Sequence, residues 1–431
     1  MAVRLQFEGI RCFQKPQDAA IRPITLLVGE NSSGKTTFLA LCRIAYSIVQ
    51  GSLTGLPFNE FPFSLGAYDQ IASKRGGAGR AASFSLGVST VRGDAELRVE
   101  FVSRDGQPSP RQWRLTAGPC TIQATKKNVT TNQYSVLMGN LRGNEETDFD
   151  HVADFDMLAA GPVAEWSARV VSEIERAGGL LGQGEFFSHS DIASLGIAQQ
   201  SLRDEFLRRP YAFAPIRTSP RRTYDPVSPE PEPEGSHTPM LMAALSRSGE
   251  ERTWKALQSA LSEFGSGSGL FDGIEIVNKG KKESDPFQIG VKSGGRVFNM
   301  IDVGYGVSQA LPILVDTSQR SSPAEFFLLQ QPEVHLHPRA QAELGSFFAT
   351  QIGRQRQFVI ETHSDHLVDR IRMEVRRKQL KPEDVSLLYF ERNRHGATIH
   401  NLALDNDGSI MDPPPGYRQF FLNEERYLLG I

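Results

Sequence analysis

The sequence predicts an α/β fold in which the core is joined by an antiparallel β-layer and a helical insertion. Three observations support this class. The apolar run 24–28 ends at Gly29 and is followed by residues with helical periodicity. The segment 81–102 alternates apolar and polar residues around a turn signal at 92–94, which predicts antiparallel strands. The apolar run 326–329 ends in two amides and a proline, as expected at the end of a buried strand.

The first residues predict a further pair of strands. The segment 3–13 alternates and then turns at Gly9, which indicates a hairpin at the edge of a sheet. Between 126 and 210 the pattern becomes polar and helical, with interruptions and no sustained heptads, so long coiled-coil arms are not expected. We therefore predict an N-terminal lobe at 1–125, a mostly helical insertion at 126–210 and a C-terminal lobe at 211–431. The Pro/Glu-rich segment 226–239 is expected to be a mobile surface loop.

The composition is that of a globular protein, with 39% hydrophobic and 23% charged residues. A formal net charge of −3 gives no general attraction to nucleic acid or acidic lipid, so such contacts would need a local patch. Cys12, Cys42 and Cys120 are odd in number and widely spaced, which favours a reducing cytoplasm over a disulfide framework. We find no signal-peptide pattern and no apolar run of roughly 20 residues, and we expect a cytoplasmic protein without a membrane span.

The strongest motif is a full match to the pattern G-x-x-x-x-G-K-[ST] after the first core strand. The glycines let backbone N–H groups curl around a β-phosphate, and the following helix adds its dipole. Lys35 is predicted to bridge the β- and γ-phosphates, and the Thr36 hydroxyl to ligate Mg²⁺. The strand–loop–helix context makes a chance match in a Gly/Ser turn the weaker alternative, so we predict binding of ATP with Mg²⁺. The nucleotide-binding residues of this loop are Gly29, Glu30, Asn31, Ser32, Ser33, Gly34, Lys35, Thr36 and Thr37.

Two later segments place polar residues at the ends of apolar elements. Residues 302–309 (DVGYGVSQ) lead into an apolar helix, for which Ser308 is the expected N-cap and Pro312 is expected in the first turn. The strand 358–360 is followed by Glu361-Thr362-His363, and Ser364 or Asp365 is expected to cap the next helix. Taken alone, the first segment fits a glycine turn with a capping serine as well as it fits a ligand site, and a lone histidine is usually structural.

The chain carries a phosphate loop, a small-residue signature, a strand at the position of the catalytic acids and a histidine, in that order. This order resembles that of the ABC-type ATPases of the SMC, RecF and OLD branch. The resemblance covers roughly 1–125 and 211–431. Several phrases are similar to a bacterial family of ATPases, many of them encoded in antiphage defence loci: LGAYDQI, YAFAPIRTSPRRTY, EGSHTP, VGYGVSQALPI, PEVHLHPRAQ and ETHSDHL. The resemblance implies an ATP-dependent head-to-tail homodimer, or a higher oligomer. Too little sequence follows His363 for a fused nuclease domain, so the effector is expected to be a separate protein, a nuclease or similar.

The resemblance also implies roles for single residues. Gly306, Ser308 and Gln309 would form the signature that holds the γ-phosphate bound by the partner subunit, and His363 would be the switch histidine. Gln70 would contact the magnesium ion, although an ordinary loop amide is an equal alternative.

The acid strand departs from the family pattern. When Pro332 is aligned, Gln330 takes the position of the acid that holds magnesium, whereas Gln331 is common at its position. Glutamine keeps the shape of glutamate but loses its charge and its ability to accept a proton, and loss of a general base costs about 10²–10⁴-fold in rate. Two explanations stay open: an engineered Glu-to-Gln change that traps the ATP-bound state, or a natural slow or inactive ATPase in which Glu333 is the acid.

Three functions are therefore considered. The first is an ATPase that serves as sensor or regulatory scaffold for an effector in antiphage defence, with hydrolysis impaired at Gln330. The second is a natural nucleotide-gated scaffold that does not hydrolyse ATP. The third is a RecF-like ATPase that binds DNA ends or gaps.

Three other patterns are given structural interpretations. His335 and His337 have metal-like spacing but no completing ligands, so structural or subunit-contact roles are favoured. The segment 405–408 is expected to be a hairpin turn rather than a nuclease carboxylate pair. The basic residues between 370 and 381 are expected to form a solvated helix face balanced by Asp369 and Glu374.

Overall fold

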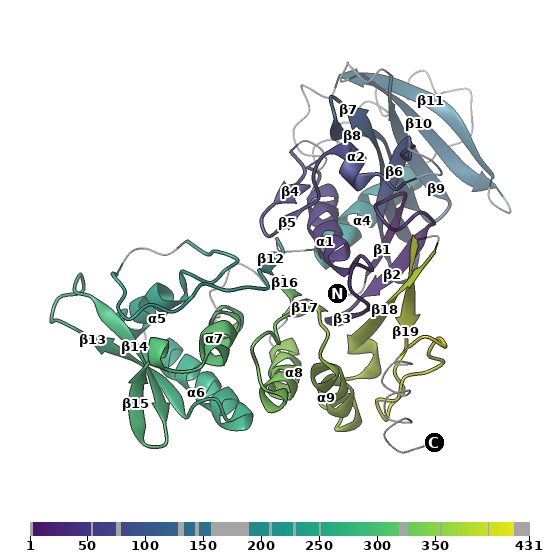
Figure 1. Cartoon of the computed structure of the whole chain (residues 1–431). Coiled ribbons are helices and arrows are strands. Elements are labelled where there is room, and N and C mark those ends of the chain that lie inside the picture. Colours follow the sequence, from purple (N-terminus) through teal and green to yellow (C-terminus); the bar gives the residue numbers. More distant parts are fainter. Residues whose placement is uncertain are drawn as a thin grey trace. The chain divides into compact units, whose positions relative to one another are not determined.

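The structure is a computed structural model that describes residues 3–52, 55–74, 79–127, 133–142, 146–156, 189–206, 209–226, 230–249, 251–318, 326–353, 356–394 and 396–417. The chain divides into two compact units (Figure 1). Unit 1 comprises 1–22, 29–209 and 389–401, and unit 2 comprises 23–28, 210–388 and 402–431. The division differs from the expected lobes because segments far apart in sequence join the same unit.

Unit 1 is built on an eight-stranded antiparallel sheet with the order β11-β10-β9-β8-β7-β6-β1-β2. The antiparallel layer is confirmed, the hairpin β1–β2 lies at the sheet edge as expected, and Gly93 takes a φ of 72° in the turn after β6. The strands are β1 (Val3–Glu8), β2 (Gln17–Ile21), β6 (Ser83–Thr90), β7 (Ala95–Arg104), β8 (Gln107–Ala117), β9 (Cys120–Lys126), β10 (Gln133–Arg142) and β11 (Glu146–Asp156).

The described part of 126–210 is not mostly helical. Strands β10 and β11 form a hairpin that extends the sheet beyond β9, and helix α4 (His189–Glu205) packs against β7, β8 and β9. The open edge of β9 offers unpaired backbone groups, and pairing with β10 satisfies them whatever the polarity of the side chains. The spacing of apolar residues along the sequence does not reveal the pairing of β10 with β9, because that pairing depends on the folded sheet.

The core of unit 1 next to helix α1 (Lys35–Val49) is a cluster of aromatic rings. Phe38 of α1 lies 6.2 Å from Phe7 and 5.8 Å from Phe390 between ring centroids, and Phe7 lies 5.0 Å from Phe13. Edge-to-face pairs of this kind add to the free energy gained by burial. Smaller elements complete unit 1: β4 (Asn59–Glu60), β5 (Phe63–Ser64) and α2 (Tyr68–Ile71).

Unit 2 contains a parallel sheet in which β12 (Tyr211–Phe213), β16 (Phe326–Gln330), β17 (Gln357–Glu361) and β3 (Ile24–Gly29) are neighbours in that order. The strand order of this sheet continues with β18 (Val385–Asn393) and β19 (Gly396–Leu402), whose residues 389–401 are assigned to unit 1. Helix α8 (Pro338–Ile352) connects β16 to β17, and α9 (Asp365–Arg376) follows β17. The buried, mostly apolar strands agree with the predicted α/β core.

A second group of elements in unit 2 surrounds helix α7 (Tyr305–Ser318). Helices α5 and α6 both contact α7, and α6 also packs on β13 (Figure 1). The elements are α5 (Thr238–Arg247), α6 (Glu251–Ser268), β13 (Gly273–Asn278), β14 (Phe287–Ser293), β15 (Arg296–Asn299) and the 3₁₀ helices Met300–Asp302 and Pro382–Asp384.

Two local predictions for α7 are wrong. The helix begins at Tyr305, so Ser308 is not its N-cap and instead donates its hydroxyl to the Tyr305 carbonyl at 2.9 Å. Pro312 lies in the helix interior, where its nitrogen cannot donate to the Ser308 carbonyl. The tertiary setting explains this position, because Pro312 packs directly on Gly235, whose φ of 74° suits glycine.

The Pro/Glu-rich segment is tied to unit 2 where it is described. The amide of Ala214 donates to the Pro233 carbonyl at 2.9 Å, and His237 is 3% exposed with its Nε2 3.1 Å from Asp316 Oδ1. Composition alone predicted a mobile loop, but these bonds hold residues 232–237 against the body of the unit.

We expect Phe38→Ala to lower the free energy of unfolding by about 3–5 kcal/mol, because it removes the ring at the centre of the aromatic cluster. Urea denaturation without nucleotide measures the effect. The control is Phe298→Ala on β15, since Phe298 is 40% exposed and its loss should cost less than about 0.5 kcal/mol. Equal costs for the two variants would contradict the assigned core.

Candidate nucleotide-binding site

The loop after β3 has the backbone conformation that its glycines permit. Gly29 has a φ of 138° and Gly34 a φ of 101°, both in the region that favours glycine. A Cβ at Gly34 would collide with the Phe13 ring and lie 2.8 Å from Cys12 Sγ, so only glycine fits there. Ser32 also takes a positive φ, of 60°. The loop therefore brings backbone closely past the N-terminus of α1, the geometry that a phosphate cradle requires.

The side chains of the loop divide by burial. Lys35 is 3% exposed, and its Nζ donates to the carbonyl oxygens of Gly29 at 2.9 Å and Glu30 at 2.7 Å. Ser33 is fully buried and donates to the Glu30 carbonyl at 2.8 Å. Helix α1 has Gly34 at its N-cap and no side-chain cap, which leaves the first turn to be approached by a ligand. Glu30, Asn31 and Ser32 are exposed, and Gly29, Gly34 and Thr36 are half-buried.

Thr37 and Gln70 have structural partners within unit 1. Thr37 is 4% exposed, and its hydroxyl accepts a bond from Arg11 Nη1 at 3.1 Å. Gln70 is exposed, and its Oε1 accepts from the Ala67 amide at 3.1 Å, so the side chain closes the first turn of α2. A Cβ at Gly66 would overlap this amide group. Contact between Gln70 and magnesium would require the side chain to leave its own helix.

In unit 2, the carboxyl ends of three parallel strands lie at one edge of the sheet. Gln330 of β16 pairs in register with Glu361 of β17, and Glu361 pairs with Leu27 of β3. Parallel partners in register point to the same face, so Gln330 and the 5% exposed Glu361 are neighbours. The phosphate loop begins two residues after Leu27 along the chain. This edge is where open α/β sheets bind their ligands.

The turn after β16 is shaped by two strained positions. Gln331 has a φ of 44°, unusual for glutamine, and its amide donates to the Glu361 carbonyl at 2.8 Å. His335 has a φ of 65°, and His337 caps α8 through its Nδ1, which accepts from the Arg339 amide at 3.4 Å. The cap gives His337 the structural role that the sequence favoured. Backbone strain of this kind is often found at functional turns.

Glu333 joins this turn to the end of β17. The carboxylate is 7% exposed, and its Oε1 accepts from the His363 amide at 2.7 Å. Burial raises the pKa of Glu333, while bonds from the His363 backbone and the Thr362 hydroxyl and the charge of Arg217 act in the opposite direction. With one oxygen held in this way, Glu333 is better placed to position His363 than to act as a base on water.

The residues predicted to form the signature, Gly306, Ser308 and Gln309, occupy the first turns of α7. Gly306 is buried, and a Cβ there would lie 3.2 Å from the His335 carbonyl oxygen, which indicates close packing on the turn after β16. Ser308 lines a pocket of about 260 Å³ together with Arg221, Tyr224 and Met300. To donate to a γ-phosphate, the Ser308 hydroxyl would have to release the Tyr305 carbonyl.

The Gln309 side chain forms hydrogen bonds with the backbone inside unit 2. Its Oε1 accepts from the Arg217 amide at 3.1 Å, and its Nε2 donates to the Arg217 carbonyl at 3.3 Å. At 3% exposure, Gln309 is a buried clamp rather than a surface ligand.

Sequence reasoning missed two residues of this region, Arg217 and Glu361. Arg217 is 2% exposed, and its burial lowers its pKa to about 10. It stands in a Pro-rich phrase whose pattern gives no sign of burial. Glu361 was identified only as the end of a strand, because the register that places it beside Gln330 is a tertiary property.

The remaining structural interpretations are confirmed where the chain is described. The amides of Asp407 and Ser409 donate to Asp405 Oδ1, and Gly408 takes a φ of 71°, so 405–408 is a turn. Ser364, not Asp365, caps α9 by accepting from the Leu367 amide at 3.1 Å. Three arginines of the basic run form ion pairs: Arg370 with Glu343, Arg372 with Asp369 and Arg377 with Glu374. Cys12, Cys42 and Cys120 are free thiols.

The loop fits the phosphates of a nucleotide, whereas the metal site is less complete. The part of the chain that the structure describes holds no group of three or more His, Cys, Asp or Glu side chains that could bind a metal by itself. A magnesium ion carried by ATP needs few protein ligands, since phosphates and water supply most of them. In unit 1, Thr36 could provide one such oxygen.

The strand, the glycine-bounded loop and the helix with Lys35 and Thr36 define a P-loop nucleotide-binding protein. Residues 182–369 match the family model described as "AAA domain, putative AbiEii toxin, Type IV TA system". This match covers less than half of the chain. The matched segment contains the signature, the strand ending at Gln330 and His363, and the phosphate loop precedes it. No curated protein matches the sequence.

Among solved structures, the chain is similar to heads of SMC proteins. An SMC head bound to the C-winged helix domain of ScpA is 12% identical, with a TM-score of 0.44 over 93% of this chain and 97% of that one. The Smc head with an extended coiled coil, bound to the C-terminal domain of ScpA, from Pyrococcus furiosus is 12% identical, with a TM-score of 0.43 over 98% of both chains. The SMC head from Thermotoga maritima is 11% identical, with a TM-score of 0.38 over 93% of this chain and 98% of that one.

We expect Lys35→Ala to weaken ATP binding by about 10- to 100-fold, because a charged donor to the phosphates is removed. Isothermal titration with MgATP measures the affinity. Lys255→Ala is the matched control, since Lys255 is exposed and pairs only with Glu251 on the surface of α6. A thermal melt of each variant shows that the fold is retained. Unchanged affinity in a folded Lys35→Ala protein would remove the loop as the nucleotide site.

Proposed function

We propose that this protein is a magnesium-dependent ATPase whose ATP-bound form is a head-to-tail homodimer and whose output is the control of a separate effector protein. The proposal of nucleotide binding is supported by the Gly29–Thr36 loop, in which the buried Lys35 donates to two carbonyl oxygens of the loop. The loop amides and the Lys35 ammonium would hold the phosphates, and Thr36 would face the magnesium ion. That ion would neutralise charge on the γ-phosphate.

The edge of the parallel sheet supports a catalytic role for unit 2. Gln330 and Glu361 lie side by side at the carboxyl ends of β16 and β17, and Glu333 holds the amide of His363. Gln330 keeps the shape of an acid at the first position of this edge but cannot accept a proton. We propose that nucleotide binding is intact and that hydrolysis is slow for this reason, whether the glutamine is engineered or natural.

Gln330→Glu should raise ATP hydrolysis by about 10²-fold or more with a much smaller change in nucleotide affinity, because the loop supplies most of the phosphate contacts. Phosphate release at saturating MgATP measures the rate. Gln331→Glu is the neighbour control and should have the smaller effect, because its backbone, not its side chain, is fixed by the bond to Glu361.

One result would reverse this assignment. If the present sequence already hydrolyses ATP and Gln330→Glu leaves the rate unchanged, another carboxylate is the base. Glu333→Gln and Glu361→Gln, measured separately, then identify which of the two it is.

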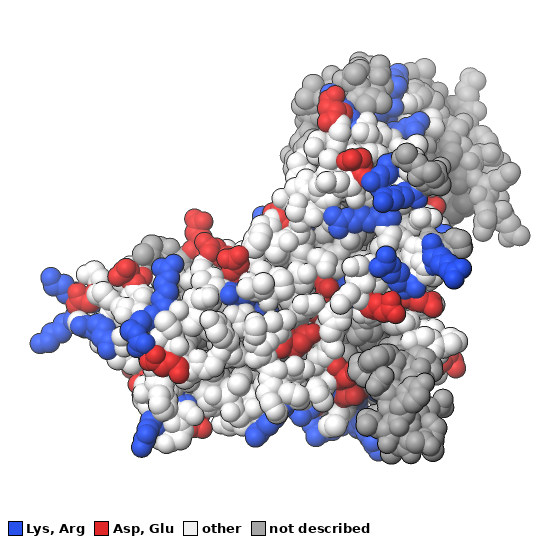
Figure 2. Space-filling view, in the orientation of Figure 1, with Lys and Arg blue, Asp and Glu red and all other residues white. Residues whose placement is uncertain are grey.

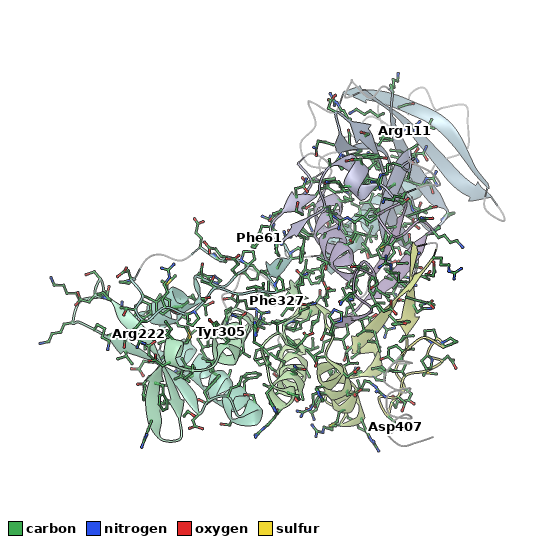
Figure 3. All side chains as sticks on the ribbon, in the orientation of Figure 1. Phe61, Arg111, Arg222, Tyr305, Phe327 and Asp407 are labelled. Carbon is green, nitrogen blue, oxygen red and sulfur yellow. The ribbon has the colours of Figure 1, made fainter. Side chains whose placement is uncertain are left out.

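The proposed dimer is supported by the surface around the start of α7. Large apolar side chains are exposed there, with Ile301 at 41% and Tyr305 at 61%. Figure 3 labels Tyr305. Val297 and Phe298 on the preceding strand β15 are exposed as well. Exposed apolar residues that are close together in sequence and precede the predicted signature would suit a surface that meets a second copy of the chain. Two such contacts would enclose two ATP molecules, each between the loop of one subunit and Ser308 of the other.

The dimer predicts a change of mass in solution. With MgATP the protein should shift from monomer to dimer, or to a multiple of the dimer, in light scattering. Lys35→Ala should not shift because it lacks the nucleotide, and Tyr305→Asp should not shift although it binds ATP with unchanged affinity. An identical mass for all three proteins with ATP would contradict an ATP-driven dimer.

The role as sensor or scaffold in antiphage defence rests on the sequence phrases that resemble that family. A RecF-like ATPase that binds DNA is the alternative. On the face of unit 2 in Figure 2, Lys and Arg lie among Asp and Glu, and two arginines of α9 and the adjoining Arg377 are paired with acids. This mixed charge favours a protein partner over a DNA groove. Among the described residues, no helix has the length and apolar character needed to cross a membrane.

A further inference from the structure

Unit 2 contains two buried opposite charges that are not bonded to each other. Within the described part of the chain, the three buried guanidinium nitrogens of Arg217 have no hydrogen-bond partner, and neither does the buried Oε2 of Glu333. Their exposures are 2% and 7%. A buried charge is costly unless an opposite charge or a hydrogen bond compensates it. Each of these two charges acts on the other, since Arg217 lowers the pKa of Glu333 and Glu333 raises that of Arg217 against the effects of burial.

Both charges are anchored to elements of the proposed ATPase site. The backbone of Arg217 is clamped on both sides by the Gln309 side chain from α7. The other oxygen of Glu333 holds the His363 amide at 2.7 Å. The start of α7 also packs on the turn that carries Glu333, through Gly306 and the His335 carbonyl. Hydrogen bonds thus link α7 to Arg217 and Glu333 to His363, and the attraction of opposite charges links Arg217 to Glu333.

We propose that Arg217 is a positioning residue that transmits movement of the signature helix α7 to Glu333 and thereby to His363 of the same chain. The proposal rests on the proposed function, in which the start of α7 contacts the nucleotide held by the partner subunit. Displacement of α7 moves Gln309, and Gln309 moves the Arg217 backbone. The guanidinium then approaches or leaves Glu333, which changes how firmly the carboxylate holds the His363 amide. One nucleotide site of the dimer would in this way adjust the other.

The unsatisfied atoms are the reason for expecting two arrangements. A guanidinium that can donate up to five hydrogen bonds and a carboxylate that can accept several are left short of partners in the present arrangement. A bond from Arg217 to the free Oε2 of Glu333 would satisfy both groups and would draw on the same carboxylate whose Oε1 holds the His363 amide. Two packings of a buried pair are the kind of bistable element through which sites become coupled.

The first test needs no nucleotide. Arg217→Met and Glu333→Gln are combined in a double-mutant cycle, with the urea midpoint of the full chain as the readout. Each single variant leaves one buried charge uncompensated, so the double variant should lose less than the sum of the two losses. Additive losses would show that the two charges do not interact and would overturn the proposal. Arg252→Met, on the exposed side of α6, is the control for loss of an arginine.

The second test follows transmission by amide hydrogen exchange in the full chain, with and without MgATP. In the parent protein, ATP should change exchange in peptides covering 305–311 and 357–367. In Arg217→Met the change at 305–311 should remain, and the change at 357–367 should fall by about threefold or more. Arg217→Lys keeps the charge and should restore most of the change. If Arg217→Met does not fold, Glu333→Gln replaces it, since it breaks the same series at the next residue.

The outcomes separate the two proposals. If ATP changes hydrogen exchange at 357–367 as strongly in a folded Arg217→Met protein as in the parent, Arg217 does not have the proposed role. This conclusion holds even if the double-mutant cycle shows that Arg217 and Glu333 interact. No response at 305–311 in the parent protein, despite ATP binding, contradicts the head-to-tail dimer and the transmission that depends on it. In that case a coupled pair in the urea cycle remains only as a stabilising contact.

Discussion

The parallel register of β16, β17 and β3 is the constraint on which the rest of unit 2 depends. It aligns Gln330, Glu361 and Leu27 across the sheet, so that three strands end at one edge. A shift by one residue would turn Gln330 or Glu361 toward the opposite face. The same register fixes the turn after β16, because the Gln331 amide donates to the Glu361 carbonyl. Glu333 then reaches the His363 amide.

Buried polar groups hold this edge together, and they do so at a cost. Glu333 is kept inside the protein with only part of its bonding capacity used, and the buried guanidinium of Arg217 has no hydrogen-bond partner among the described residues. An apolar core would be cheaper in free energy. Such charges are retained where position matters more than stability, as at the carboxyl edge of a nucleotide-binding sheet. Because the Gln309 side chain is bonded to the Arg217 backbone, the position of helix α7 is linked to the position of the Arg217 charge.

In unit 1, the phosphate loop depends on packing behind it. Gly34 is held against Phe13 and Cys12, and the rings of Phe7, Phe38 and Phe390 support the first turn of α1. The loop carbonyls of Gly29 and Glu30 in turn fix the Lys35 ammonium. Local sequence defines the loop, and residues far from it in the chain, such as Phe390, keep it in shape.

The sequence alone predicted the P-loop, core strands at 24–28, 326–329 and 358–360 and the antiparallel layer, because each of these has a local pattern of apolar spacing or turn chemistry. Only the tertiary structure decided that 133–142 and 146–156 are strands, that α7 begins three residues before Ser308 and that Gln309 clamps Arg217. Edge pairing, close packing of Pro312 on Gly235 and burial of a charge are interactions between residues distant in sequence. A single sequence carries no periodic signal for them, and for this reason Arg217 and Glu361 became visible only in the folded chain.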